Sequence, residues 1–497
     1  MSTPASPTPA LDLASLLAAH EGESLALHDQ YINPSMAAVL KTIGFDTNYI
    51  RGRGAYLYDA RDRRFIDCLG GYAVHNCGRN HPVIRDALKQ ALDLDLPNLP
   101  GIGVYRTAPL LAKALVDIMP TAPRAMPPTS ARHRRRSEKD DRGASAALDT
   151  VFFANSGAEA IDAAIKHARI ATGRNKIVYC TRAYHGLTLG ALSINGNHEF
   201  REGFGELLDA VEIPFNDLAA LEKALIEHAP AAFIVEPIQG KGVNIPANHY
   251  LAACAALCAR HNVLFVLDEI QTGFGRTGRM WACEHDGAGQ TWLPDMIVAA
   301  KGLSGGLIPV SALICKRWIH TKVFPSMSHC SKIQTTFGMN DLAMVAGLAT
   351  LHVLKHEKIV ENAASVGDHL VAELRRRIGA MSMVKDIRGR GLMVAIEFQA
   401  PKKLGLRMGW DLLHKLDPSL FCQAVIMPLM TDHRVLAQVA GHRLDIIKLI
   451  PPLVLTRADA EEVAAAFEAT VAACHQFPGP AWEVGKKLGA AAVKRFA

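Results

Sequence analysis

The sequence predicts an α/β fold, in which a mostly parallel central sheet flanked by helices forms a large domain and a smaller α+β domain accompanies it. The first observation is that short apolar strands alternate with helical segments through the middle third of the chain. The second is a change of pattern after residue 340, where long helices and a strand pair follow one another. The third is the length of 497 residues, which exceeds what one hydrophobic core ordinarily organises. The predicted strands of the central sheet cover residues 151–154, 176–180, 232–237, 263–269, 296–300 and 310–315.

Composition and pattern divide the chain into parts. Residues 1–24, rich in Pro, Ala, Ser and Thr, are expected to form a flexible N-terminal arm. The large domain is expected over residues 81–340. The smaller domain is expected to combine an N-terminal segment, residues 25–80, with a C-terminal segment, residues 341–475. A basic tail covers residues 476–497.

A charged stretch that contains proline interrupts the large domain at about residues 121–147. Its run 132–136 reads Arg-His-Arg-Arg-Arg, and it has no apolar periodicity. Because it cannot bury apolar area, we predict an exposed, disordered insertion. Much of the positive charge lies here, so the net charge of +6 does not describe a nucleic-acid-binding face. A nucleic-acid or nuclear-import role for these arginines is the less favoured alternative.

The cysteines and the apolar runs indicate a protein of a reducing compartment, and we expect a cytoplasmic location. The 10 cysteines are irregularly spaced. Cys254 and Cys258 lie on a predicted helix, but no further ligands follow at the spacing of a metal site, so no metal is expected. The N-terminus lacks a basic region followed by an apolar core, and no apolar run reaches membrane-spanning length. We therefore expect neither a secretory signal nor a membrane contact.

Local patterns predict the elements around the central sheet. Residues 55–59 and 64–67 alternate apolar and polar around a charged turn, which predicts a hairpin. The stretch 70–82 carries clusters of Gly, Asn and His around an aromatic, and it is either a loop that approaches another group closely or a plain connection. Helices are predicted over residues 82–92, from the turn at 155–160 to 172, and over 249–260, 342–356, 363–378 and 458–474, with further strands in 388–397 and 445–450.

A lysine at the end of an apolar run is the centre of the predicted site. Residues 296–300 are apolar and lead into Lys301, and the glycine-rich turn 302–306 follows. The run is predicted to be a buried strand, which places Lys301 at the sheet edge where α/β proteins bind ligands. Most lysines at strand ends are merely solvated. A desolvated lysine amine, however, is a nucleophile able to form a Schiff base.

Two further groups fall on the same edge of the sheet. Ser156, Gly157 and Ala158 lie between a strand and a helix start, where unpaired backbone amides attract a phosphate. Small residues also cap helices for structural reasons. Asp268 ends a strongly apolar strand, so its carboxylate needs a partner, which is either an arginine or a protonated heterocyclic nitrogen.

An aromatic pair completes the set. Tyr184 and His185 follow the strand 176–180 at a loop length typical of such folds. Tyr184 offers a flat face for stacking on a ring, although a single tyrosine is more often a core residue. A phosphate cradle, an acid for a ring nitrogen, a stacking surface and an amine are together the requirements of pyridoxal 5'-phosphate, which the sequence therefore predicts as cofactor.

Short motifs occur in a characteristic order along the chain. They are Asn155-Ser156-Gly157-Ala158-Glu159-Ala160, Tyr184-His185-Gly186, Glu236-Pro237-Ile238-Gln239-Gly240, the run 267–278 (LDEIQTGFGRTG), the stretch 294–302 around Lys301, and Thr335-Thr336-Phe337-Gly338-Met339-Asn340. With these motifs the sequence resembles the class III (omega) aminotransferases, which have the fold type I pyridoxal-phosphate architecture. The resemblance runs from about residue 33 to residue 474 and is interrupted by the insertion.

The resemblance implies roles around the cofactor. Lys301 would bind the cofactor and later move the proton, and Asp268 would keep the pyridine nitrogen protonated. Gln271 would contact the phenolic oxygen of the ring, and Tyr184 would stack on it. The implied cofactor-binding residues are Ser156, Gly157, Ala158, Tyr184, His185, Asp268, Gln271, Lys301 and Thr336.

The resemblance also implies a partner and a substrate side. Thr336 would reach the phosphate from a second subunit, so a homodimer with the active site at the subunit interface is expected. Tyr72 and Glu236 would line the substrate side, together with Lys241 and Lys448 at positions where this sequence departs from the family.

The departures concern specificity. Family members that use glutamate often have an acidic residue at the position of Lys241, and an arginine where Lys448 precedes the sequence Pro451-Pro452-Leu453. Lysine neutralises a carboxylate but lacks the bidentate fork of arginine, so 2-oxoglutarate is not established as the acceptor. A minor departure is residues 338–341, which read Gly-Met-Asn-Asp where the family has Gly-Gly-Asn-Pro.

We therefore expect an aminotransferase that moves an amino group from a primary amine or omega-amino compound to a 2-oxo acid. A diamine, an omega-amino acid and a long-chain amine all remain open as donors. An aminomutase or decarboxylase on the same fold is the alternative that only products would separate. A non-catalytic binding protein is disfavoured by the presence of both Lys301 and Asp268.

Overall fold

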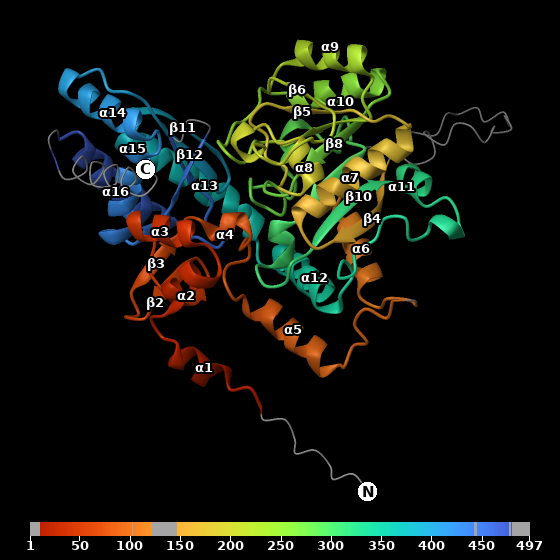
Figure 1. The fold of residues 1–497 in the computed structure, drawn as a ribbon, viewed down its shortest axis with the longest axis horizontal. Coiled ribbons are helices and arrows are strands. Elements are labelled where there is room, and N and C mark those ends of the chain that lie inside the picture. Colours follow the sequence, from red (N-terminus) through yellow and green to blue (C-terminus); the bar gives the residue numbers. More distant parts are fainter. Residues whose placement is uncertain (1–9, 102, 122–146, 442–444, 477–478, 480–497) are drawn as a thin grey trace, which may run out of the picture.

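The computed structural model describes residues 10–101, 103–121, 147–441, 445–476 and 479. Within these residues the chain forms one sheet of seven strands and two of four. Figure 1 shows the seven-stranded sheet and its helices on one side of the molecule and the smaller sheets on the other. The insertion was predicted at about residues 121–147, and its residues 122–146 lie outside the described residues, as does most of the basic tail.

The seven-stranded sheet is mostly parallel, which confirms the prediction. Its strand order is β4-β10-β9-β8-β7-β5-β6, and β10 is the strand that runs antiparallel to both of its neighbours. The sequence pattern missed β6, because this edge strand is only half-buried and contains Glu212. The strands are β4 (Leu148–Ala154), β5 (Ile177–Cys180), β6 (Ala210–Ile213), β7 (Ala232–Val235), β8 (Leu264–Asp268), β9 (Met296–Ala299) and β10 (Ser311–Lys316).

Side chains that alternate along the central strands enter two separate cores. In β9, Ile297 and Ala299 belong to one core and Met296 and Val298 to the other. Helix α7 covers the second face by packing on β9 and β10, while α10 packs on β8 across the first. The helices of this side are α5 (Pro82–Asp93), α6 (Ala108–Asp117), α7 (Gly157–Thr172), α8 (Leu189–Ser193), α9 (Leu218–His228), α10 (Tyr250–Arg260), α11 (Arg317–Val323) and α12 (Asp341–His356).

The second sheet combines three strands from the N-terminal segment with one strand from the C-terminal segment. Strands β2 and β3 form the predicted hairpin, and β13 pairs in parallel with β3, so that Val435 lies opposite Ile66. The N-terminal and C-terminal segments expected in the smaller domain thus share a sheet, while the domain boundaries stay predictions. The strands are β1 (Tyr49–Arg53), β2 (Tyr56–Asp59), β3 (Arg64–Asp67) and β13 (Val435–Leu436).

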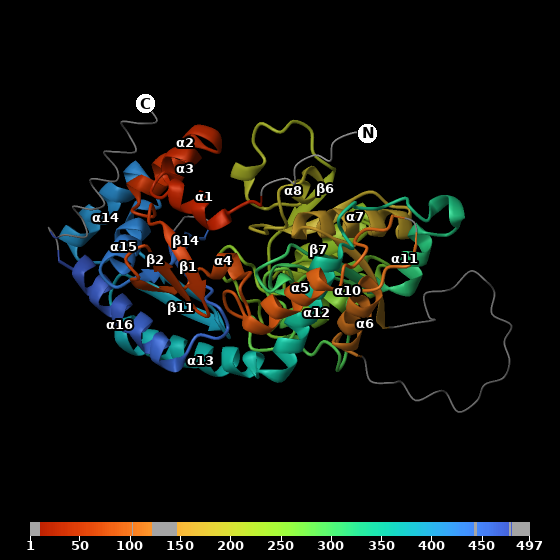
Figure 2. The same ribbon diagram turned by 90° about the horizontal axis from the view of Figure 1, so that it is seen from below.

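The third sheet is antiparallel and has the order β11-β12-β15-β14. Its strands are β11 (Val384–Arg390), β12 (Met393–Phe398), β14 (Gln438–Ala440) and β15 (Ile446–Leu449). Helix α13 packs on β11 and on α16, as Figure 2 shows from below. Helix α15 escaped sequence prediction because it is apolar on nearly every face and shows no amphipathic period. The helices of this side are α2 (Ser24–Tyr31), α3 (Pro34–Thr42), α4 (Gly70–Ala73), α13 (Ile359–Ile378), α14 (Leu404–Leu416), α15 (Leu420–Thr431) and α16 (Arg457–Cys474).

The described part of the predicted N-terminal arm contains a short helix, α1 (Leu13–Ala19), which the sequence pattern did not predict. The Asp12 side chain accepts a hydrogen bond from Ser15 N at 3.1 Å and caps this helix, and none of its residues is buried. Local capping alone therefore supports it. Over the described part of the chain, no helix is long and apolar enough to span a membrane. The same residues contain no group of three or more His, Cys, Asp or Glu side chains that could hold a metal ion.

Candidate active site

A cavity of about 1030 Å³ opens at the carboxyl ends of the parallel strands. Apolar side chains from distant parts of the chain, among them Met36, Phe200 and Val439, form part of its wall. Each predicted site residue other than Thr336 lines it, namely Tyr72, Ser156, Gly157, Ala158, Tyr184, His185, Glu236, Lys241, Asp268, Gln271, Lys301 and Lys448. The tertiary structure thus brings these residues together, while their individual roles stay predictions.

Lys301 lies just beyond the end of β9, in a sharp turn. Its backbone φ is +32°, a conformation that non-glycine residues seldom adopt. A Cβ atom on the following Gly302 would lie 2.5 Å from Asn76 Nδ2, so the stretch 70–82 does approach the lysine turn closely. Burial lowers the pKa of the Lys301 amine, and the charges of Asp268 and Glu236 oppose this in part. A lowered pKa favours the neutral, nucleophilic form of the amine.

Asp268 and His185 form a buried pair on the cavity wall. His185 Nδ1 lies 2.7 Å from Asp268 Oδ2, and Ile270 N donates to Asp268 Oδ1 at 3.0 Å. Burial acts to lower the pKa of His185, but the hydrogen bond and the charge of Asp268 outweigh it and raise this pKa. His185 was predicted among the cofactor-binding residues. In the structure it contacts Asp268, whose carboxylate would pair with the pyridine nitrogen of the cofactor.

Glu236 follows β7 and organises the turn after it. Its carboxylate accepts hydrogen bonds from Gly240 N at 2.8 Å and from Tyr184 N at 3.1 Å. Burial raises the pKa of Glu236 to about 7, with His185 opposing and Asp268 adding to the rise. Glu236 therefore changes charge near neutral pH while it holds the Tyr184 backbone at the cavity wall.

The start of helix α7 forms another part of the wall. The Ser156 hydroxyl accepts from Glu159 N at 3.2 Å, and Glu159 Oε2 accepts in return from Ser156 N at 3.1 Å, which is a capping box. Within the described chain no acceptor is found for the backbone N–H groups of Gly157 and Ala158, which are the first residues of the helix. This helix end can therefore bind an anion.

Lys448, on β15, reaches the cavity from the smaller sheets. Its Nζ donates to the Gly240 carbonyl at 2.9 Å and to Gln271 Oε1 at 3.4 Å. Gln271 Nε2 lies 3.5 Å from the Tyr72 carbonyl. Gln271 is thus held between two segments, one of which is the short α4, where Tyr72 adopts a left-handed φ of +61°.

Lys241 lines the cavity and already has a partner. Its Nζ is 2.5 Å from Glu199 Oε1 and 5.1 Å from the centroid of the Phe200 ring. The Tyr184 ring meets the edge of the same Phe200 ring, with centroids 5.8 Å apart. Phe200 was not predicted, because nothing in the sequence near it marks a site.

The family model described as aminotransferase class-III matches residues 40–471 of the chain. The protein belongs to this family. An aminotransferase named PigE from Serratia sp. is 31% identical over 90% of this chain, and the chain spans 53% of the length of PigE. A transaminase from Sulfurisphaera tokodaii, named for LysW-aminoadipate semialdehyde and glutamate semialdehyde, is 33% identical over 83% of this chain and 92% of its own length.

A solved structure shares the fold. The ornithine aminotransferase of Toxoplasma gondii, described with partial occupancy of pyridoxal phosphate at its active site, superposes with a TM-score of 0.76. The two chains are 27% identical, and the comparison covers 94% of this chain and 100% of that one. The architecture is therefore that of the pyridoxal-phosphate aminotransferases, as the sequence predicted.

Class III aminotransferases use pyridoxal phosphate, and the residues of this cavity fit it. Gly157 and Ala158 offer unpaired N–H groups for the phosphate, and a Cβ on Gly157 would lie 2.9 Å from Ile270 Cδ1, so a larger residue there would displace the Ile270 side chain. Asp268 is the buried carboxylate that would pair with the ring nitrogen, and Lys301 is the buried amine that would hold the cofactor. When bound, the cofactor supplies a protonated pyridine ring that withdraws electrons from the carbon bearing the amino group.

This class III aminotransferase also has a buried arginine that sequence reasoning missed. Arg276 is fully buried and donates to the carbonyls of Leu392 at 2.9 Å and Pro451 at 2.5 Å, and to Asn76 Oδ1 at 2.6 Å. Asn76 Nδ2 in turn donates to the Phe274 carbonyl at 2.9 Å. Arg276 belongs to a recognised motif, but its partners lie far away in the sequence, so no local signal reveals its role.

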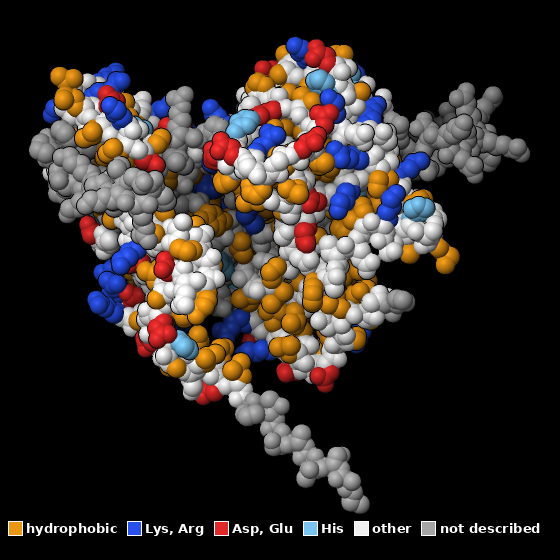
Figure 3. Space-filling view, viewed as in Figure 1, with side chains coloured by type: hydrophobic (Ala, Val, Ile, Leu, Met, Phe, Trp, Pro, Cys, Tyr) orange, Lys and Arg blue, Asp and Glu red, His pale blue; other side chains and the backbone are white. Residues whose placement is uncertain are grey.

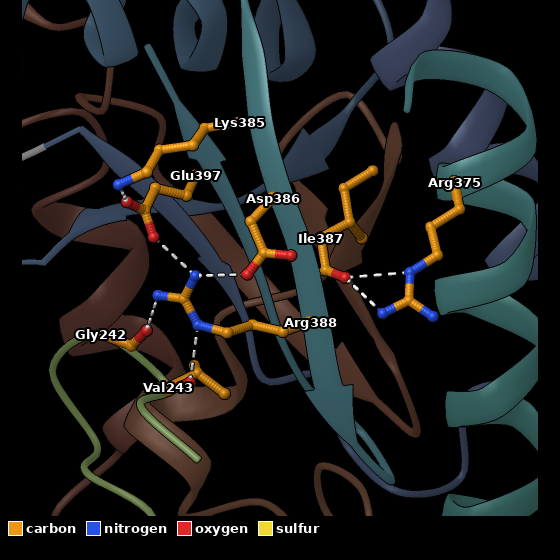
Figure 4. Close-up of polar contacts among 8 residues, drawn as sticks. All are labelled: Gly242, Val243, Arg375, Lys385, Asp386, Ile387, Arg388 and Glu397. Atoms are coloured by element: carbon orange, nitrogen blue, oxygen red, sulfur yellow. Dashed lines mark hydrogen bonds and ion pairs between the residues drawn. The ribbon is translucent and has the colours of Figure 1, made fainter. Parts of the chain in front are cut away.

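A second arginine holds the turn that carries Lys241, as Figure 4 shows. Arg388, on β11, donates to the Gly242 carbonyl at 2.8 Å and the Val243 carbonyl at 2.9 Å. Its Nη1 also lies 2.6 Å from Glu397 Oε2. The third sheet thereby positions the turn 240–243, whose Gly240 carbonyl accepts from Lys448.

Thr336 is the predicted site residue that the structure does not bring to the cavity. It is exposed in the single chain, next to Phe337, which is 58% exposed, and it precedes helix α12. Its role at the phosphate of a second subunit stays a prediction.

Proposed function

We propose that this protein moves an amino group from a primary amine or omega-amino compound to a 2-oxo acid. The observation that carries the proposal is the buried Lys301 amine, which shares one cavity with Asp268 and Glu236. Lys301 moves a proton at the carbon bearing the amino group, because burial lowers the pKa of this amine and it gives up its proton more readily than a solvated lysine. Asp268 provides a negative charge that its two hydrogen-bond partners hold in place.

The names of the relatives support a donor whose amino group is remote from its carboxylate. Ornithine carries a terminal amino group. Aminoadipate semialdehyde and glutamate semialdehyde are the aldehydes that replace such a terminal amino group when it is transferred. The apolar wall of the cavity, to which Met36 and Phe200 contribute, adds space for a carbon chain. These names favour an omega-amino acid as donor, and the diamine and long-chain amine classes share its terminal amino group.

The visible absorbance of the purified holoenzyme tests the proposal. We expect the absorbance of the bound cofactor to change on adding a terminal amine without an oxo acid, and to return when an oxo acid follows. Lys301→Ala should lose the rapid response, whereas Lys316→Ala, which removes the partner of Asp295 at the other end of β9, should keep it. Absorbance that no amine of the panel changes would contradict the proposal.

An aminomutase or a decarboxylase is the second candidate, since both would use the same amine, carboxylate and phosphate site. Product analysis separates the three reactions. Carbon dioxide release indicates a decarboxylase, and an isomeric amine without an oxo-acid requirement indicates an aminomutase. We expect neither, because the named relatives are transaminases.

We propose further that the active form is a homodimer in which Thr336 reaches the cofactor phosphate of the partner. Figure 3 shows hydrophobic side chains gathered over α5 and the chain that follows it. Exposed apolar residues of this region include Leu92, Leu94, Val104 and Leu110. An apolar surface of this kind is typical of an interface between subunits.

Mixing two inactive variants tests the shared site. Lys301→Ala and Thr336→Ala should each be poorly active, and a refolded mixture should regain activity because a mixed dimer contains one site with both native residues. A mixture that stays as inactive as its components would contradict the shared site, as would a monomer in sedimentation. We also propose a cytoplasmic location, supported by buried free thiols such as those of Cys68, Cys180 and Cys258.

A further inference from the structure

Lys448 is a buried ammonium in the cavity wall that has no carboxylate partner among the described residues. Only 5% of the residue is exposed. Its two acceptors, the Gly240 carbonyl and Gln271 Oε1, are both uncharged, and no acidic side chain of the described chain lies within 4.0 Å of Nζ. An ammonium has three N–H donors, so one remains for a ligand. A buried charge without a counter-ion is costly, and a bound anion would relieve that cost.

The other cations that line the cavity are already engaged. Among the described lining residues these are Lys301, whose amine the reaction requires, and Lys241. Lys241 is paired with Glu199 at 2.5 Å. His185 is held by Asp268 at 2.7 Å. Lys448 is therefore the cation in the described wall that remains available to a substrate carboxylate.

We propose that Lys448 binds the carboxylate of the oxo-acid substrate through a single ammonium, and that the acceptor is a monocarboxylic 2-oxo acid of the pyruvate type. This inference rests on the proposed amino transfer. An ammonium is a point charge without the bidentate fork of a guanidinium. A second carboxylate, as in 2-oxoglutarate, would need a second cation, and it would have to displace Glu199 from Lys241. One available cation therefore matches an acceptor with one carboxylate.

The charge of Lys448 makes this binding depend on pH. Burial, assisted by the charge of Lys301, lowers the pKa of Lys448 to about 7, with Glu236 opposing and Arg276 adding to the fall. The ammonium is present below this pKa and is lost as the pH rises through it. Because only the protonated fraction binds, we expect the KM for pyruvate to rise about tenfold for each pH unit above the pKa. Glu236, whose pKa is about 7, gains negative charge over the same interval and needs its own control.

The test measures the KM for pyruvate and for 2-oxoglutarate with the holoenzyme from about pH 6 to about pH 9. Lys448→Met should raise the KM for pyruvate about tenfold or more below neutral pH, because a charged hydrogen bond is lost. Lys448→Arg stays charged over the whole range and should lose the pH dependence. A calorimetric titration of the holoenzyme with propionate, a monocarboxylate that cannot react, should weaken in parallel for Lys448→Met.

Two further variants separate the neighbouring charges. Glu236→Gln removes the other group that titrates near neutral pH, and the rise in KM should persist in it. Glu199→Gln releases Lys241 and should lower the KM for 2-oxoglutarate while leaving the KM for pyruvate unchanged, since Glu199 does not line the cavity.

A Lys448→Arg enzyme whose KM for pyruvate still rises with pH would overturn the inference. A wild-type kcat/KM higher for 2-oxoglutarate than for pyruvate would also overturn it. Failure of the proposed amino transfer would be seen in a different measurement. The first half of that reaction needs no oxo acid and is followed by the cofactor absorbance when the amine is added. Variants that keep this response but change the KM of the acceptor therefore report on Lys448.

Discussion

The pair of Asp268 and His185 gives the cavity a fixed negative charge beside the amine of Lys301. Both carboxylate oxygens of Asp268 are engaged, one by His185 at 2.7 Å and one by Ile270 N at 3.0 Å. The side chain is therefore oriented before any ligand arrives, and the energetic cost of ordering it has been met in folding.

Asp268→Asn should lower kcat by about 100-fold or more, because a preorganised charge that stabilises the reacting state is removed. Steady-state kinetics of the holoenzyme measure this effect. Asp295→Asn is the matched control: Asp295 precedes β9 and pairs with Lys316 at 2.7 Å, far from the lysine turn. The kcat of Asp295→Asn should stay within about twofold of the wild-type value, because Asp295 does not line the cavity. Equal losses in both variants would show that Asp268 acts through folding alone.

At the scale of single elements, Ser156 at the start of helix α7 caps the helix and is also a predicted cofactor-binding residue. The Ser156 hydroxyl caps the helix through Glu159 N at 3.2 Å, whereas the unpaired N–H groups that fit a phosphate belong to Gly157 and Ala158. Capping orders these N–H groups, so the two tasks are coupled through the backbone.

Ser156→Ala should lower the free energy of unfolding by about 1 kcal/mol through loss of the cap. The affinity for pyridoxal phosphate should change only a few-fold if the backbone supplies the phosphate contacts. Thr456→Ala, which removes the capping box of α16, should cost about the same stability and leave cofactor affinity unchanged. A loss of cofactor affinity of about tenfold or more in Ser156→Ala alone would mean that the hydroxyl itself holds the phosphate.

At the scale of the whole molecule, Arg276 connects the cavity to the smaller sheets. Its guanidinium bonds Asn76, the Leu392 carbonyl and the Pro451 carbonyl, which come from three distant segments. Burial lowers the pKa of Arg276 to about 9, and Asp67 opposes this fall. Its hydrogen bonds therefore join the stretch 70–82 to the chain that follows β15.

Arg276→Met should lower the free energy of unfolding by about 2–4 kcal/mol, because several buried carbonyl and amide groups lose their donor. Thermal unfolding of the holoenzyme followed by circular dichroism measures this. Arg375→Met is the control: Arg375 donates to the Ile387 carbonyl from Nη2 at 2.7 Å and from Nε at 3.0 Å, and it lies on α13 beside the third sheet (Figure 4). If Arg276→Met melts no earlier than Arg375→Met, the connecting role is wrong.

The prediction from sequence succeeded where the signal was local. The apolar run of β9 ending before Lys301, the strand ending at Asp268 and the small residues at the start of α7 each reveal a strand end or helix end within a few residues. Because parallel strands end at one edge, the predicted cofactor residues other than Thr336 were expected in one place, and they line one cavity.

The elements that the sequence did not predict lack such a signal. The two-residue β13 pairs with β3 only because the chain returns there, and α15 is apolar on nearly every face, so neither has a period of its own. Their existence depends on packing and not on local propensity.

The sequence by itself determined the fold class, the family and the chemical types of the site residues, because those follow from short motifs and from the period of apolar residues. Only the tertiary structure decided which side chains meet: His185 with Asp268, Lys448 with Gln271, and Lys241 with Glu199. Burial and counter-charge, which set the pKa of Lys448, arise from residues distant in sequence such as Glu236 and Lys301. An ammonium's charge and its available partners depend on that surrounding volume, which no local stretch of the sequence describes.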